Sequence, residues 1–143
     1  MVSAASTLRQ IAEESGSDPR GAVLRAVGDF SGIGVAAQQV LVASYIRPET
    51  TRGGIIRVDK ALMEDRFQGK VGLVLKIGTL AFQDDSVNKF GGFSVQPGEW
   101  AIYRPSDGLE LFHVADNGRA AAPIRLFADT SIVGKVDDPW RIY

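Results

Sequence analysis

Hydrophobic periodicity divides the chain into a helical N-terminal part and a strand-forming remainder. An apolar stripe at helical spacing includes Leu8 and Ile11. Asp18 and the proline after it have the chemistry of an N-cap and a first helical residue, and a second apolar stripe then ends at Gly28. Helices this short are not stable alone in water, so each must pack on another part of the molecule. Residues 1–39 are therefore predicted to form an N-terminal helical arm.

From residue 40 onward the apolar positions follow the shorter period of β-strands. Segments bounded by Gly, Pro, Asn or Asp predict strands over residues 40–46, 70–77, 99–104, 109–114, 124–128 and 132–136. Between the second and third of these, a hairpin or long loop is expected over residues 82–92. Short strands separated by tight turns favour a small barrel over a layered α/β domain. The predicted fold is mainly β: a partly open barrel over residues 40–136, followed by a C-terminal tail over residues 137–143.

The amino-acid composition argues against several classes of partner. Sixteen Lys and Arg oppose seventeen Asp and Glu, a net charge of −1, and the charges are spread along the chain without the basic stripe that a nucleic acid requires. The absence of cysteine excludes disulfides and thiolate metal sites. No apolar run approaches the ~18 residues of a membrane span, and the first residues lack the features of a signal peptide. We expect neither nucleic acid nor membrane as a partner.

Candidate catalytic chemistry is sparse. The one histidine, His113, lies in an alternating segment and is expected to be structural or on the surface, and no second His or Cys completes a zinc site. The series Gly32-x-Gly34 has no strand before it and no helix after it, as a dinucleotide-binding loop requires, and is interpreted as a hinge. The pairs Asp84-Asp85 and Asp137-Asp138 are expected to be solvated loop charges. The chain is therefore predicted not to be an enzyme and to use no metal or cofactor.

An ordered series of motifs resembles the GroES-type co-chaperonins over about residues 40–136. The series begins with an apolar strand at Val40-Leu41-Val42, a polar loop, and the short run Gly53-Gly54-Ile55-Ile56. A Gly-led strand over residues 69–78 and the entry Val95-Gln96-Pro97-Gly98-Glu99 are similar to later elements of the family, as is the closing pair of strands. Residues 79–95 take the position of the hairpin that roofs the family's dome.

The resemblance implies a ring in which the first strand of one copy pairs with the last strand of its neighbour. Removing an open sheet edge in this way is physically favourable. On this basis, Val40, Leu41 and Val42, together with Ile132 and Val133, are interface candidates. The resemblance also implies a partner-binding loop, formed by Gly53, Gly54, Ile55, Ile56 and Arg57.

Three departures from the family affect the expected partner. Arg57 stands where the family's clasp carries a third apolar residue, which is costly in an apolar groove. The arm, with the interface candidates Leu8 and Ile11, has no family counterpart, and the tail adds Trp140 and Tyr143. These two aromatics either anchor an interface or pack back on the barrel.

Two functions follow from the resemblance and its departures. Viruses carry GroES-like proteins, and the departures favour a capsid decoration (cement) protein, a homo-oligomer bound to the major capsid protein shell in the virion and assembled in the host cytoplasm. The alternative is a cytoplasmic co-chaperonin that caps a chaperonin ring through a mobile loop.

Overall fold

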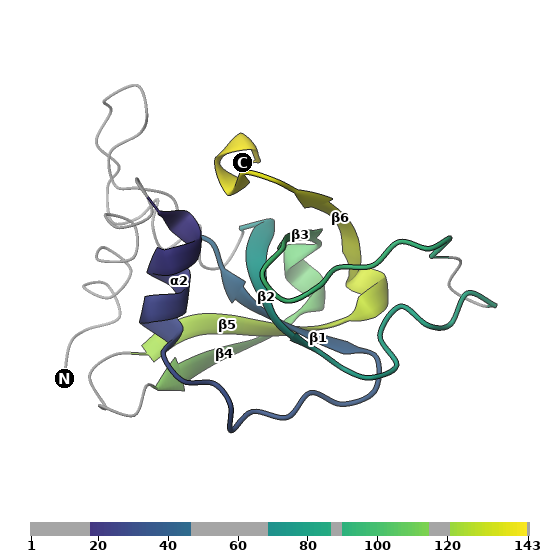
Figure 1. Cartoon of the computed structure of the whole chain (residues 1–143), viewed down its shortest axis with the longest axis horizontal. Coiled ribbons are helices and arrows are strands. Elements are labelled where there is room, and N and C mark those ends of the chain that lie inside the picture. The colour runs from purple at the N-terminus through teal and green to yellow at the C-terminus, as the bar shows by residue number, and fades with distance from the viewer. Residues whose placement is uncertain (1–17, 47–68, 87–89, 115–120, 143) are drawn as a thin grey trace.

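The computed structural model describes residues 18–46, 69–86, 90–114 and 121–142 (Figure 1). Six strands form one antiparallel sheet in the order β4-β5-β1-β2-β3-β6. Their bounds are β1 Gln39–Ser44, β2 Val71–Ile77, β3 Trp100–Tyr103, β4 Leu109–Val114, β5 Ala121–Ala128 and β6 Ile132–Val136. The two outer strands, β4 and β6, do not pair with each other in the part of the chain that is described, so the sheet is open. The prediction of a mainly β fold is confirmed.

The described helix, α2 (Pro19–Val27), begins and ends where the sequence predicts. The Asp18 carboxylate accepts a hydrogen bond from the Gly21 backbone N–H (3.0 Å), which satisfies one of the unpaired donors of the first turn. At the other end, the Gly28 N–H donates to the Leu24 carbonyl oxygen with Gly28 at positive φ (71°), a conformation that glycine adopts without strain. Three short 3-10 helices, η1 (Pro105–Asp107), η2 (Asp129–Ser131) and η3 (Pro139–Arg141), connect or follow the later strands.

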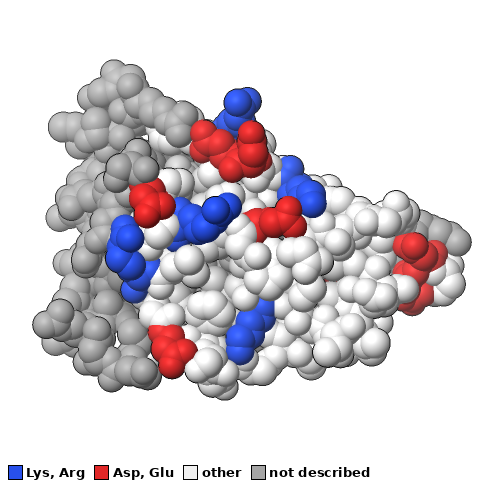
Figure 2. Space-filling view, viewed as in Figure 1, with Lys and Arg blue, Asp and Glu red and all other residues white. Residues whose placement is uncertain are grey.

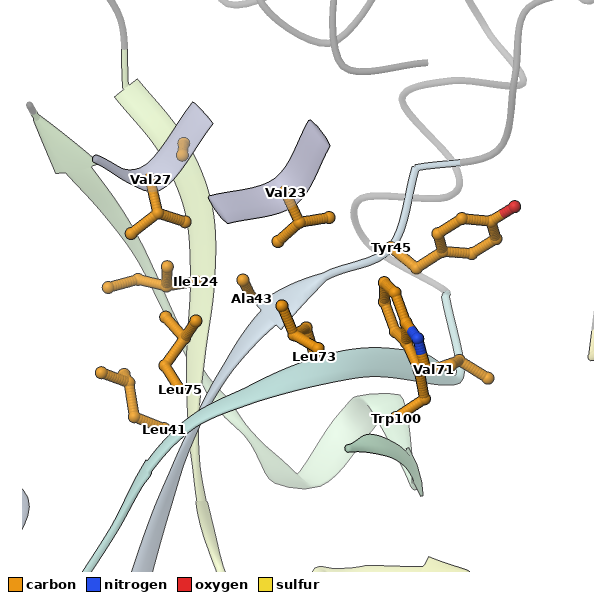
Figure 3. Packing of buried hydrophobic residues seen from close by; sticks show 11 residues of the cluster. Val23, Val27, Leu41, Ala43, Tyr45, Val71, Leu73, Leu75, Trp100 and Ile124 are labelled. Carbon is orange, nitrogen blue, oxygen red and sulfur yellow. The ribbon is translucent and has the colours of Figure 1, made fainter. Parts of the chain in front are cut away.

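Apolar residues cover both faces of the sheet, which explains why β1 and β2 are almost continuously apolar. On one face, side chains from β1, β2 and β5 pack beneath α2, and Val23 and Val27 of the helix join them (Figure 3). On the other face, Val40, Val42 and Phe127 pack against the long segment that connects β2 and β3. A strand buried on both faces loses the alternation of a half-exposed strand.

This packing shows where the second helix of the predicted arm lies. Val23 and Val27 are buried in the same cluster as Leu41 of β1. The helix over residues 19–27 therefore packs on the sheet and contributes to its core. The first apolar stripe of the predicted arm, which includes Leu8 and Ile11, lies outside the described residues.

The described parts of the segment between β2 and β3, residues 78–86 and 90–99, extend away from the sheet (Figure 1). Its base is held by Phe82, whose ring makes edge-to-face contacts with Phe90 (5.3 Å) and Phe93 (6.1 Å). Phe82 has a positive φ of 62°, and its N–H donates to the buried carboxylate of Asp129 (3.0 Å). The segment is thus fixed to the sheet by a small aromatic core, in agreement with the long loop that the sequence predicts. Acidic side chains lie at its far end (Figure 2).

Candidate functional site

The predicted interface residues of β1 lie in the interior of their own subunit. Val40, Leu41 and Val42 are fully buried. β1 pairs with β2 on one side and β5 on the other, so it has no free edge to offer a second copy. Their assignment as interface residues is corrected to a core role. The continuous apolar run that these residues form in the sequence is typical of a central strand.

The remaining described candidates are divided. Ile132 is buried, whereas Val133 beside it is 52% exposed. Trp140 is half-buried in η3, where its backbone N–H donates to the Asp138 carboxylate (3.0 Å). Ile142 packs against the core cluster beneath α2. The described part of the tail therefore packs back on the sheet.

The other sequence-predicted site residues fall outside the described part of the chain. They are Leu8, Ile11, Gly53, Gly54, Ile55, Ile56, Arg57 and Tyr143.

The exposed apolar side chains of the described residues concentrate on the outer strand β4. Four of its six residues are large and apolar, and all four are exposed on one face or the other: Leu109 59%, Leu111 41%, Phe112 39% and Val114 57%. On its inner side, β4 pairs with β5 over its whole length without a register shift. The sequence predicts this strand over residues 109–114 but not the exposure of its apolar side chains. The exposure could have been inferred from the sequence of β4, which has apolar residues at both odd and even positions and contains no Pro, Lys or Gly.

The backbone groups that β4 presents outward can be assigned from the ladder. The Asp129 N–H donates to the Gln38 carbonyl oxygen (2.9 Å), which continues the β1–β5 pairing by one residue. In an antiparallel ladder, residues bonded to one neighbour alternate with residues bonded to the other. Leu126, Ile124 and Ala122 of β5 therefore bond to β4. Their partners in register are Leu109, Leu111 and His113. It follows that Glu110, Phe112 and Val114 direct their N–H and C=O groups away from the sheet, and we call these groups the β4 edge.

The opposite edge of the sheet, β6, differs from β4 in ways that hinder pairing. Ile102 pairs with Gly134 and Tyr103 with Ile132, so Val133 is an extra residue that forms a bulge. The strand also contains Lys135, whose ammonium contacts the Glu99 carboxylate (3.1 Å). A bulge and a lysine on an edge strand are features that protect sheets from edge-to-edge association. β4 has neither.

His113 connects β4 to α2. Its Nδ1 donates to the Val27 carbonyl oxygen at the end of the helix (2.9 Å). Nearby, Asp29 accepts hydrogen bonds from Ser31, which lower its pKa, and His113 and Lys76 add smaller effects in the same direction. The histidine therefore joins a helix end to the sheet, a structural role.

A buried polar cluster lies on the opposite face, where the Arg125 guanidinium lies over the rings of Tyr103 (5.9 Å) and Phe127 (5.5 Å). The Arg125 guanidinium donates to the Pro105 carbonyl oxygen. The Tyr103 hydroxyl donates to the Val71 carbonyl oxygen (3.1 Å), and burial raises the pKa of this phenol to about 12. Because the Tyr103 phenol is buried and neutral and the Arg125 guanidinium stacks on two rings, both groups fit a structural role.

Room for a small molecule is limited at the cleft between α2 and the sheet. This cleft has an apolar lining that includes Val23, Val27 and Ala122, and it encloses no space even for a water molecule. Within the described ranges, His, Asp and Glu side chains form no group able to hold a metal ion. Nor is any helix in those ranges long and apolar enough to cross a membrane.

Comparison with protein families and with curated proteins finds no match for this chain. The likeness to the co-chaperonins therefore depends on the order of motifs in the sequence, and the candidate site depends on the geometry of the sheet edges.

Proposed function

We propose that this chain is a non-enzymatic assembly protein: a GroES-like β protein that, as a homo-oligomer, decorates and stabilises a virus capsid. The observation that supports it is the outer strand β4, where the large apolar side chains of Leu109, Leu111, Phe112 and Val114 are exposed. Apolar side chains exposed together on one strand are typical of surfaces that contact a partner. Its partners would be further copies of the chain and the major capsid protein, and its location the virion.

A second function is supported by a different feature. The segment over residues 78–99 extends from the sheet and is fixed at its base by the Phe82 cluster. In the co-chaperonins, the corresponding hairpin roofs a dome above the chaperonin chamber. A cytoplasmic co-chaperonin that binds a chaperonin ring through residues 53–57 is therefore the alternative.

One pair of measurements distinguishes the two functions. If the chain decorates a capsid, quantitative mass spectrometry of purified virions finds it in a fixed stoichiometry to the major capsid protein. If it is a co-chaperonin, the purified chain co-elutes with a chaperonin ring when nucleotide is present and separates from it when nucleotide is removed. A chain that is missing from virions and does not bind the ring contradicts both proposals.

A further inference from the structure

We infer that the segment between β2 and β3 is a lid over one apolar face of the sheet, and that the Asp129 carboxylate is the latch that holds this lid closed. The lid is defined as residues 81–86 and 90–97. Its base covers the sheet, and its far end extends beyond the sheet (Figure 1). The inference goes beyond the proposed assembly role and does not depend on it.

The buried cluster beneath the lid has two layers. The sheet supplies one layer, which includes the fully buried side chains of Val40, Val42 and Phe127. The lid supplies the other layer, which consists of Ala81, Phe82 and Val95, with Phe90 and Phe93 partly buried beside them. The described residues of the lid contain no helix or strand. The two layers are therefore held together by side-chain packing and not by a backbone ladder.

A buried hydrogen bond joins the lid to the sheet. The Phe82 N–H donates to the Asp129 carboxylate (3.0 Å), and Asp129 is only 3% exposed. Asp129 is itself fixed to the sheet, because its N–H donates to the Gln38 carbonyl oxygen (2.9 Å) and its carbonyl oxygen accepts from the Ile132 N–H. The carboxylate therefore stays with the sheet when the lid moves.

The backbone of Phe82 is strained when the lid is closed. Its φ of 62° lies in the left-handed region, which a residue with a bulky side chain rarely occupies. Such a conformation persists only where the surroundings impose it, and strained residues of this kind cluster at clamps and switches. Here the hydrogen bond to Asp129 and the burial of the Phe82 ring impose it. Release of the latch allows Phe82 to relax, which favours the open lid.

Both ends of the lid are anchored, so they serve as hinges. Before the lid, backbone hydrogen bonds join residues 78–80 to residues 37–39. After the lid, the Gly98 N–H donates to the Val74 carbonyl oxygen (2.9 Å). Between these anchors, the edge-to-face contacts of the Phe82 ring with two other phenylalanine rings give the lid a small core of its own. The lid can therefore move as one body while the sheet stays folded.

Opening of the lid changes the surface that the molecule presents. The side chains of Val40 and Phe127 are fully buried in the closed form and lose their cover in the open form. A partner that binds apolar surface there binds the open form and not the closed form, so it shifts the population toward opening. The lid thus regulates access to an apolar face that the closed protein hides.

Thiol labelling under native conditions tests the lid, because the natural chain contains no cysteine. Val40→Cys places a thiol beneath the lid, and Val71→Cys is the matched control, because Val71 is a buried valine in the cluster on the opposite face. In each background, the rate of reaction with a soluble disulfide reagent is measured with and without Asp129→Ala. Loss of the latch is expected to raise the rate at position 40 on the order of tenfold and to raise the rate at position 71 much less.

Two further variants control for the chemistry of the latch. Asp129→Asn keeps an oxygen acceptor but removes its charge, so a smaller increase at position 40 is expected. It also provides the same comparison if Asp129→Ala does not fold. Asp107→Ala removes an exposed carboxylate in η1 and is expected to leave both rates unchanged.

Amide hydrogen exchange of the natural chain gives an independent measurement. The Phe82 amide is expected to exchange faster than the interior amides of β1 and β2, because it is released when the lid opens and theirs require the sheet to unfold. A Phe82 amide that exchanges as slowly as the amides of β1 and β2 would show that the lid does not open separately.

Two labelling results would also overturn the inference. If removal of the Asp129 carboxylate accelerates positions 40 and 71 by the same factor, the carboxylate stabilises the whole fold and holds no lid. If it accelerates neither position in a folded variant, the lid has no latch at Asp129.

Discussion

At the scale of single residues, the hydroxyl of Tyr103 is a buried polar group that is held by its hydrogen bond. Its ring lies 4.4 Å from that of Phe127, and its hydroxyl reaches the Val71 carbonyl oxygen at the start of β2. Arg125 stacks above both rings. One tyrosine thus joins strands β2, β3 and β5 by a hydrogen bond, a ring contact and a cation–π contact. Its phenol is useful to the fold only in the neutral form.

The raised pKa of Tyr103 predicts how stability depends on alkaline pH. Because the folded pKa (about 12) exceeds the ordinary value of 10.0, the neutral phenol's contribution is complete below pH 10 and is lost as the pH rises toward 12. Tyr103→Phe is expected to cost about 1 kcal/mol at pH 7 through the lost hydrogen bond. Above pH 10 the difference in unfolding free energy between the variant and the natural chain should shrink. Denaturant unfolding at pH 7, 9 and 11 measures it.

An absorbance titration near 295 nm provides the control for this prediction. The natural chain should show a late phenolate step that Tyr103→Phe lacks. If all tyrosines titrate together near pH 10 while the protein is folded, the burial of Tyr103 is contradicted.

At the scale of elements, the close approach of β1, β2 and β3 requires a glycine at position 72. A Cβ atom there would lie 2.7 Å from the Ala43 carbonyl oxygen and would overlap the Val42 side chain. Both neighbours belong to β1, one a backbone atom and the other a buried branched side chain, so neither can move away easily. The central strands therefore leave no room for a Cβ atom at position 72.

Alanine substitutions at two strand glycines should show that the central position 72 tolerates a side chain less well than position 134 on the outer strand β6. Gly72→Ala is expected to lower the free energy of unfolding by about 1–3 kcal/mol through overpacking. Gly134→Ala is the matched control on β6, because a Cβ there meets Ile102 at 3.5 Å, an ordinary contact. Chemical denaturation measures both variants. Equal effects would show that the central strands have more room than the structure gives them.

How far the elements follow from the sequence depends on whether their determinants are local. Turn residues and capping chemistry are local, and the predicted bounds of α2, β4 and β6 agree with the structure. β5 begins at Ala121, three residues earlier than predicted, and therefore includes Pro123. Its missing N–H faces β1, and pairing with β1 ends at Ile124, so the proline breaks no ladder bond.

Strand order and edge exposure could not be predicted in the same way. The resemblance to the co-chaperonins placed Val40–Val42 at an interface, whereas pairing with β2 and β5 places them at the centre. Which strand lies at an edge depends on pairings between residues far apart in the chain. The β4 edge became visible only after those pairings were known.

At the scale of the whole molecule, the described residues form one unit in which a helix covers a sheet. Val23 and Val27 enter the cluster that contains Leu73 and Trp100, and His113 ties the end of α2 to β4 (Figure 3). Apolar burial of this kind couples the stability of the helix to that of the sheet. We therefore expect α2 and the strands to unfold together.

Adjacent substitutions on α2 test whether helix and sheet unfold together. Val23 is 2% exposed and Leu24 is 39% exposed. Val23→Asp should lower the free energy of unfolding by several kcal/mol, on the order of 3–5, because a carboxylate replaces an apolar side chain inside the core. Leu24→Asp is the control and should change it by less than about 1 kcal/mol. Far-UV circular dichroism follows the helix and strands, while tryptophan fluorescence, recorded in a Trp140→Phe background because the chain has two tryptophans, reports on Trp100 within the shared cluster. Coincident transitions that shift together in Val23→Asp are expected, since the helix and Trp100 contribute to the same core. If the substitution removes helical signal but leaves the tryptophan transition in place, α2 is an appended arm and the sheet is stable without it.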